Sequence, residues 1–94
     1  MKKGAILITT EQKMKKISPA NGTDFTLEEL QGYVGGWIEI INLNPRVIMI
    51  VNEEGKGELE PNGFATVMAK AMNAIFPDDY IVGDAVMCPS EMVK

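Results

Sequence analysis

The sequence predicts an α+β fold: a mostly antiparallel sheet of about five strands in the element order ββαββαβ, with two helices packed on one face. Three observations lead to this prediction. Short runs of apolar, β-branched residues bounded by turn residues are typical of strands. Two longer segments place apolar residues at helical spacing behind a capping residue. The 94 residues contain no repeat or linker, which predicts a single domain over residues 1–94.

The amino-terminal part of the chain predicts two strands. Residues 4–9 form a short apolar run, as expected for a buried strand. Residues 13–18 alternate lysine with methionine before Ile17, which predicts a half-exposed strand. Lysines are typical of an edge strand, where their charge discourages pairing with other chains.

Residues 26–34 predict the first helix. Thr26 and Glu29 form the capping-box pattern, in which each side chain accepts a hydrogen bond from the backbone of the other residue. Gly35 and Gly36 then end the helix, one of them in a left-handed conformation. The expected buried stripe consists of Leu27, Leu30 and Val34.

Residues 37–41 and 47–51 predict a hairpin around the turn pair Asn44-Pro45. The first strand alternates, so that one face carries Ile38 and Ile40 and the other carries Trp37, Glu39 and Ile41. The second strand is uniformly apolar, as expected for a central strand that is covered on both faces.

The carboxyl-terminal part predicts a helix and a last strand. Asn62 caps a helix that runs to about Ile75 and ends before Pro77. Residues 80–88 form the last strand, in which Gly83 indicates a bulge or a close backbone approach. The apolar stripe of the helix is expected to comprise Phe64, Val67, Met68, Ala71, Met72 and Ile75.

Composition excludes several kinds of chemistry. The chain has no histidine and one cysteine, which excludes a Ser-His or Cys-His nucleophile pair and a zinc site of the usual kind. Cys88 has no intrachain partner and is expected to be a structural thiol in a reducing compartment. The amino terminus lacks the features of a signal peptide, and no apolar segment approaches the ~18 residues of a membrane span. We therefore expect a cytoplasmic protein with no membrane contact.

Glu39 is the most unusual polar residue, because it lies between isoleucines inside a predicted strand. It fits a ligand-binding or acid/base carboxylate in a cleft; alternatively, its face of the hairpin is solvated, or it pairs with Lys or Arg across the sheet. Trp37 shares its face. The tryptophan suits stacking on a planar ligand whose polar edge Glu39 would bind, and it equally suits packing under the second helix.

Three further polar residues are candidates for ligand binding. Asn52 and Asn62 are placed to reach backbone groups or a ligand at the same end of the sheet. Asp84 brings a second carboxylate into an apolar run. Together with Glu39 it would hold Mg²⁺ or Mn²⁺ in a hydrolase only if both side chains share a face. This enzyme is the less favoured alternative, and we expect no catalytic residue, no metal and no cofactor.

Charge is distributed unevenly along the chain. The first 20 residues hold five of the nine basic residues and only one acid; the five are Lys2, Lys3, Lys13, Lys15 and Lys16. These lysines form a solvated face or contact a nucleic acid. Neither arginine nor interleaved aromatic residues accompany them, which disfavours nucleic-acid binding and leaves it as an alternative function.

Several motifs, taken together, resemble a known family. They are Leu-Glu-Glu-Leu-Gln at 27–31, Val-Gly-Gly-Trp-Ile-Glu at 34–39, Val-Asn-Glu-Glu-Gly-Lys at 51–56, Pro-Asn at 61–62 and Ile-Val-Gly-Asp-Ala-Val at 81–86. Over residues 25–87 their order resembles that of domain-of-unknown-function family 3846, which occurs in bacteria, phages and mobile elements. That family carries no established activity, so the resemblance implies no catalytic residue.

The resemblance and the composition lead to one functional hypothesis. Compact accessory proteins of phages and mobile elements tend to bind host components, which is an argument by association. We predict a non-enzymatic binding protein that counters host antiviral defence by sequestering a nucleotide-like signal or by blocking a host protein. A homo-oligomer is a further prediction, because a second copy can complete the core of a small, methionine-rich domain.

Overall fold

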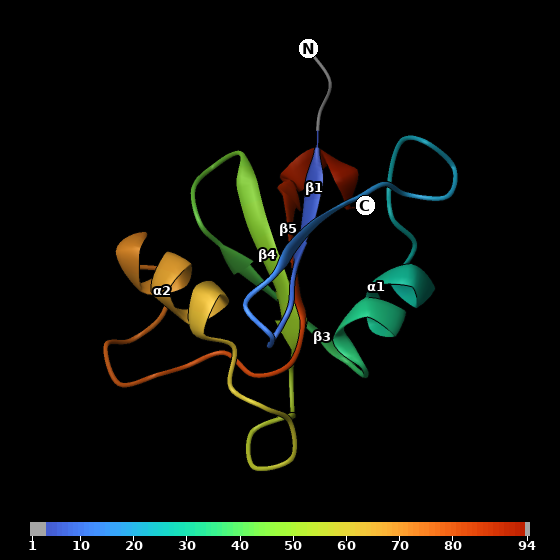
Figure 1. Ribbon diagram of the computed structural model, residues 1–94. Coiled ribbons are helices and arrows are strands. Elements are labelled where there is room, and N and C mark those ends of the chain that lie inside the picture. Colours follow the sequence, from blue (N-terminus) through green and yellow to red (C-terminus); the bar gives the residue numbers. More distant parts are fainter. Residues whose placement is uncertain (1–3, 94) are drawn as a thin grey trace.

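A computed structural model describes residues 4–93 as a five-stranded sheet with two helices, which confirms the α+β prediction and the element order (Figure 1). The strands lie in the order β2-β1-β5-β4-β3, and every neighbouring pair is antiparallel. No helix within these residues is long and apolar enough to span a membrane. The elements are β1 (Ala5–Ile8), β2 (Met14–Ile17), α1 (Leu27–Val34), β3 (Ile38–Asn42), β4 (Val47–Asn52), α2 (Gly63–Ala71), β5 (Ala85–Pro89) and a 3₁₀ turn, η1 (Ser90–Met92).

The sheet consists of two hairpins joined by the last strand. β1 pairs with β2 and β3 pairs with β4, while β5 lies between β1 and β4 and pairs with both. Val86 of β5 therefore stands opposite Leu7 on one side and Ile50 on the other, and it is fully buried. This arrangement leaves β2 and β3 as the two edges of the sheet.

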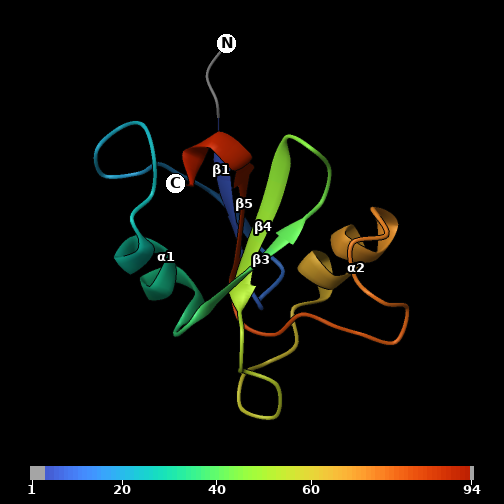
Figure 2. The same ribbon diagram turned by 180° about the vertical axis from the view of Figure 1, so that it is seen from behind.

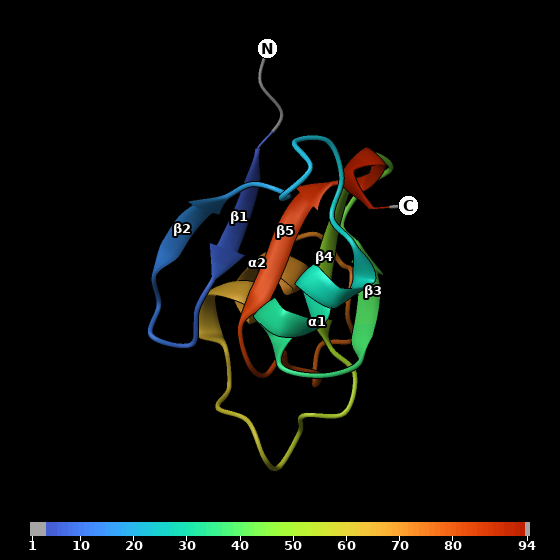
Figure 3. The ribbon, with the colours of Figure 1, turned by 90° about the vertical axis from the view of Figure 1, so that its right-hand side faces the viewer.

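The two helices cover opposite faces of the sheet, so the prediction that both pack on one face is wrong (Figures 2 and 3). Leu30 and Val34 of α1 lie in one buried cluster, together with Ile48 and Ile50 of β4. Alanines of α2 lie in a second cluster with the intervening β4 residues, Met49 and Val51. Successive side chains of a strand point to opposite faces, so the uniformly apolar run of β4 needs cover on both sides.

The predicted cap of α1 is confirmed. The Thr26 hydroxyl accepts a hydrogen bond from the Glu29 backbone N–H at 3.1 Å, and Glu29 Oε1 accepts one from the Thr26 N–H at 2.9 Å. Backbone N–H donors from Thr26 and Ala20 lower the pKa of Glu29. Gly35 ends the helix with a φ of +83°, the left-handed conformation expected there. Of the predicted stripe, Leu30 and Val34 are buried and Leu27 is exposed.

Helix α2 differs from its prediction in length and in orientation. It ends at Ala71 rather than near Ile75, and Asn73 follows with a φ of +55°, which a helix cannot continue through. Ala65 and Ala69 face the sheet, whereas Phe64, Val67 and Met72 of the predicted stripe are exposed. Met68 and Ile75 of the predicted stripe are half-buried and pack against the same cluster as the two alanines.

This orientation predicts opposite effects for two small substitutions in α2. Val67→Ala should change the free energy of unfolding by less than about 0.5 kcal/mol, because Val67 is 67 % exposed. Ala69→Val should lower it by about 1–3 kcal/mol, because the added methyl groups overpack a site with no exposed surface. Urea unfolding followed by circular dichroism measures both values. A larger loss at Val67 than at Ala69 would contradict the observed orientation.

The last strand is shorter than predicted. β5 begins at Ala85, and residues 80–84 precede it; in this segment Val82 forms an isolated antiparallel bridge with Pro61, and both residues lie outside the five strands. Gly83 has a φ of +74°, and a Cβ there would lie 2.9 Å from Leu59 Cδ1. The tight contact at Gly83 is therefore with a side chain, because the nearest backbone atom, the Val34 oxygen, would lie 3.7 Å from that Cβ, which is an ordinary contact distance. Residues 80–82 instead form part of the wall of a cavity on the α2 side of the sheet.

Candidate functional site

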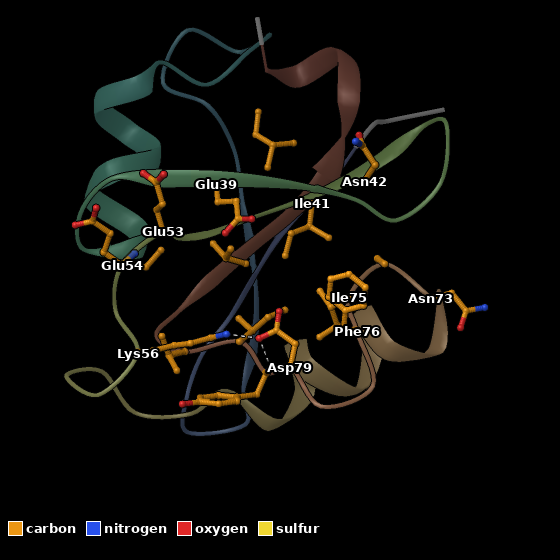
Figure 4. Close-up of a pocket in the computed structure, with 17 residues that line it drawn as sticks. Glu39, Ile41, Asn42, Glu53, Glu54, Lys56, Asn73, Ile75, Phe76 and Asp79 are labelled. Carbon is orange, nitrogen blue, oxygen red and sulfur yellow. Dashed lines mark hydrogen bonds and ion pairs between the residues drawn. The ribbon is translucent and has the colours of Figure 1, made fainter.

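A depression lies on the α2 side of the sheet, between β3, the turn that follows β4 and the segment that follows α2 (Figure 4). Its volume is about 710 Å³, which falls within the range of ligand pockets, roughly 300–1,000 Å³. Residues 39–42, 51–54, 73–76 and 79–82 form its wall, together with Lys56. Segments far apart in the sequence thus meet at one site.

The wall of this cavity is acidic. Glu39 comes from β3, Glu53 and Glu54 come from the turn after β4, and Asp79 comes from the segment after α2. Glu39 faces the cavity because it stands opposite Val51, and both point to the α2 side of the sheet. Lys56 is the one cation among the described residues of the wall, so four carboxylates and one ammonium group give a net charge of −3.

The single lysine of the wall is already engaged. Its Nζ forms an ion pair and hydrogen bond with Asp79 Oδ1, and it lies 4.9 Å from the centroid of the Tyr80 ring. The hydrogen bond to Asp79 raises the pKa of Lys56, and the nearby Glu39 carboxylate adds to this. The same bond, with a second from the Tyr80 backbone N–H, lowers the pKa of Asp79. Both groups are therefore ionised near neutral pH.

Apolar side chains complete the cavity. Ile41 and Ile75 belong to the buried or half-buried cluster beneath it. Phe76 is 78 % exposed at the rim, and Tyr80 is also exposed. Carboxylates beside exposed aromatic rings suit a ligand that carries positive charge on an apolar stem.

The structure places Trp37 outside this cavity. Its side chain is 65 % exposed and does not line the cavity wall formed by the described residues. The two interpretations of Trp37, stacking over a ligand beside Glu39 and packing under α2, are therefore both without support in this fold. Its backbone carbonyl accepts a hydrogen bond from the Glu53 N–H at 2.9 Å. This bond extends the pairing of β3 and β4 by one residue pair, at the end of the hairpin away from its turn.

The two candidate asparagines bind backbone groups. Asn52 lines the cavity, but its amide donates to the Val34 carbonyl at 3.1 Å and its oxygen accepts from the Glu54 N–H at 2.9 Å. Asn62 is completely buried, and its amide donates to two backbone carbonyls while its oxygen caps α2. Of the two alternatives left open for these residues, the structure favours backbone contacts over ligand contacts.

Asp84 lies apart from Glu39. It lines a second, smaller depression together with Tyr33 and Val34 of α1, whereas Glu39 lines the cavity on the α2 side. Its Oδ1 accepts a hydrogen bond from the Thr10 backbone N–H at 3.1 Å. A metal ion shared by two carboxylates needs them within roughly 5–6 Å, whereas these two line separate depressions. Within residues 4–93, no group of three or more Cys, Asp or Glu could hold a metal ion.

The lysines of the amino-terminal hairpin lie far from the cavity in the sheet order. Lys13, Lys15 and Lys16 are exposed on or beside β2, the edge opposite β3. The prediction of a lysine-bearing edge strand is thus confirmed for these three residues. Lys2 and Lys3 lie outside the described residues.

The sequence pattern indicates Glu39 as a candidate site residue but not its neighbours in the cavity. Lys56 and Asp79 are 23 residues apart in loops, where no periodic pattern indicates which way a side chain points. Phe76 and Tyr80 lay in segments predicted as the end of a helix and the start of a strand, and neither element reaches them. Cys88 is buried, and burial raises its pKa to about 11, which fits the predicted structural thiol.

Comparison with known proteins identifies one family. A family model described as "Domain of unknown function (DUF3846)" matches residues 1–92. The match covers the motifs at 27–31, 34–39, 51–56, 61–62 and 81–86 and extends over both the β1–β2 hairpin and η1. No curated protein and no solved structure matches the chain.

Proposed function

We propose that this chain, which belongs to the DUF3846 family, is a non-enzymatic binding protein whose acidic cavity holds a positively charged segment of a partner protein. One observation carries the proposal: four carboxylates and one already paired lysine share the cavity wall with apolar side chains. Lysine and arginine side chains match such a site, because their stems cover apolar surface while the charged head stays near carboxylates and water.

The same charge distribution bears on the kind of ligand. A nucleotide-like ligand would bring phosphate groups close to Glu39, Glu53 and Glu54, and like charges repel at this range. The only cation of the described cavity wall, Lys56, is paired with Asp79. Of the two modes predicted from the sequence, these contacts support the blocking of a protein over the sequestration of a nucleotide. Action on a host protein by a phage or mobile element is compatible with this mode and stays a prediction.

Calorimetry with defined probes tests the proposal. The pentapeptide acetyl-Val-Arg-Val-Arg-Val-amide should bind, whereas ADP-ribose and cyclic AMP should not. Glu39→Gln should weaken peptide binding about two- to fivefold, the range expected for one exposed ion pair. Glu28→Gln is the matched control, because Glu28 is exposed on α1, on the other side of the sheet, and it should leave the affinity unchanged. Nucleotide binding without peptide binding would contradict the proposal.

A further inference from the structure

The two edges of the sheet are protected differently. β2 carries exposed lysines, a common device against pairing with other chains. β3 reads Ile-Glu-Ile-Ile-Asn and has neither a lysine nor a proline within it. In residues 4–93 no other strand covers its outer side (Figure 3). The edge beside the acidic cavity is therefore the one that is open to another strand.

The hydrogen-bond pattern shows which backbone groups this edge presents. Trp37 and Leu43, at the two ends of β3, both bond to the β4 side: the Glu53 N–H donates to the Trp37 carbonyl, and the Leu43 N–H donates to the Val47 carbonyl. Glu39 and Ile41 lie two and four residues after Trp37 along the strand, so their backbone N–H and C=O groups point to β4 as well. Because the bonding direction alternates along an antiparallel strand, the N–H and C=O groups of Ile38, Ile40 and Asn42 point outward.

The side chains of β3 determine which side chains a strand paired with this edge should carry on each of its two faces. Glu39 points to the cavity on the α2 side of the sheet. Ile40 points to the other side and is 46 % exposed. A strand added outside β3 would alternate in the same way, so one of its faces lies beside Glu39 and the cavity and the other covers Ile40.

From these contacts we infer that the partner segment binds as a sixth strand, antiparallel to β3, with basic side chains beside Glu39 and apolar side chains beside Ile40. The inference rests on the proposed function and adds the conformation of the partner and its point of attachment. Backbone pairing supplies affinity in such strand addition, and alternate side chains supply specificity. The antiparallel direction continues the pattern of all four existing strand pairs.

The pentapeptide probe separates backbone pairing from charge attraction. In an antiparallel pair, its valines stand opposite Ile38, Ile40 and Asn42, and their N–H groups point at β3. The arginines stand opposite Glu39 and Ile41, and their N–H groups point away. N-methylation of the central valine should therefore weaken binding about tenfold, through a lost hydrogen bond and a steric clash. N-methylation of one arginine is the matched control and should change affinity less than twofold.

Amide hydrogen exchange supplies a second readout on the protein itself. Peptide binding should slow exchange at the outward N–H groups of Ile38, Ile40 and Asn42. The N–H groups of Glu39 and Ile41 already bond to β4 and should change much less. Protection confined to other parts of the cavity wall, or equal losses from the two N-methylated peptides, would overturn strand addition.

The outcomes distinguish the inference from the proposed function. If the peptide binds, and its affinity falls with Glu39→Gln but does not change on N-methylation, the acidic cavity is a binding site and strand addition is overturned. A peptide that does not bind at millimolar concentration overturns both. Tighter binding by the chain's own segment 13–18, Lys-Met-Lys-Lys-Ile-Ser, together with concentration-dependent sedimentation, would identify a second copy as the occupant and overturn the assignment to a partner protein.

Discussion

Replacing Ile50 with alanine is expected to lower the free energy of unfolding by about 2–5 kcal/mol. Ile50 has no exposed surface, stands between Val86 of β5 and Ile40 of β3, and faces α1. Alanine removes buried methyl and methylene groups and leaves a cavity that the closely packed neighbours fill only in part. A domain of this size has a total stability of roughly 5–15 kcal/mol, so this single change removes a large share of it.

Ile40→Ala is the matched control for Ile50→Ala. The two isoleucines are direct partners across the β3–β4 hairpin and share a face of the sheet, but Ile40 is 46 % exposed. Its truncation should cost less than about 1 kcal/mol, because much of the removed surface already contacts water. Urea unfolding of both variants, followed by circular dichroism, gives the comparison. Equal losses would contradict the position of α1, which covers Ile50 and leaves Ile40 at the edge.

Local features of the fold could be predicted from the sequence because they depend on residues near one another in the chain. The capping box of Thr26 and Glu29 and the left-handed glycine at Gly35 are both present. The β3–β4 hairpin and the cap at Asn62 are present as well. Each depends on hydrogen bonds or backbone angles within a few residues, which short patterns encode directly.

The arrangement of the helices could not be predicted with the same rules, because it depends on long-range packing. The apolar positions of α2 suggested a buried stripe through Val67, yet the inner face is formed by Ala65 and Ala69. Both kinds of residue are apolar, so the pattern does not tell which of them faces the sheet. The two-sided cover of β4 was indicated by its uniformly apolar run, but that run does not say which element covers which side.

The candidate site was predicted only where strand periodicity applies. Glu39 lies in a regular strand, so alternation placed it on the correct face. Trp37 and Asp84 lie just outside strands, where alternation no longer fixes the direction of a side chain. Lys56 and Asp79 meet through the folding of two loops, and a pairing of this kind has no signature in a single sequence.

Asn62→Ala is expected to lower the free energy of unfolding by about 4 kcal/mol, since each buried polar group left without a partner costs about 1–3 kcal/mol. The Asn62 amide donates to the Ile8 and Gly83 carbonyls, both at 2.9 Å, and its oxygen accepts from the Ala65 N–H at 3.0 Å. The side chain is completely buried. One residue thus connects the end of β1, the segment before β5 and the start of α2, and alanine leaves all three contacts unmade.

Two variants separate these contributions. Thr26→Ala removes an exposed cap from α1 and should cost only about 1 kcal/mol. Asn62→Ser keeps an acceptor for the Ala65 N–H but provides no donor pair, so it should retain most of the loss seen in Asn62→Ala. Equilibrium unfolding in urea measures all three. If Asn62→Ala costs no more than Thr26→Ala, the two carbonyl contacts contribute nothing, and Asn62 acts as a helix cap alone. If the full loss is observed, the buried Asn62 amide is needed, beside the backbone bonds from Asn62 N–H to the Ile81 carbonyl and from Gly83 N–H to the Glu60 carbonyl, to hold the segment from Ile81 to Gly83, which includes part of the cavity wall.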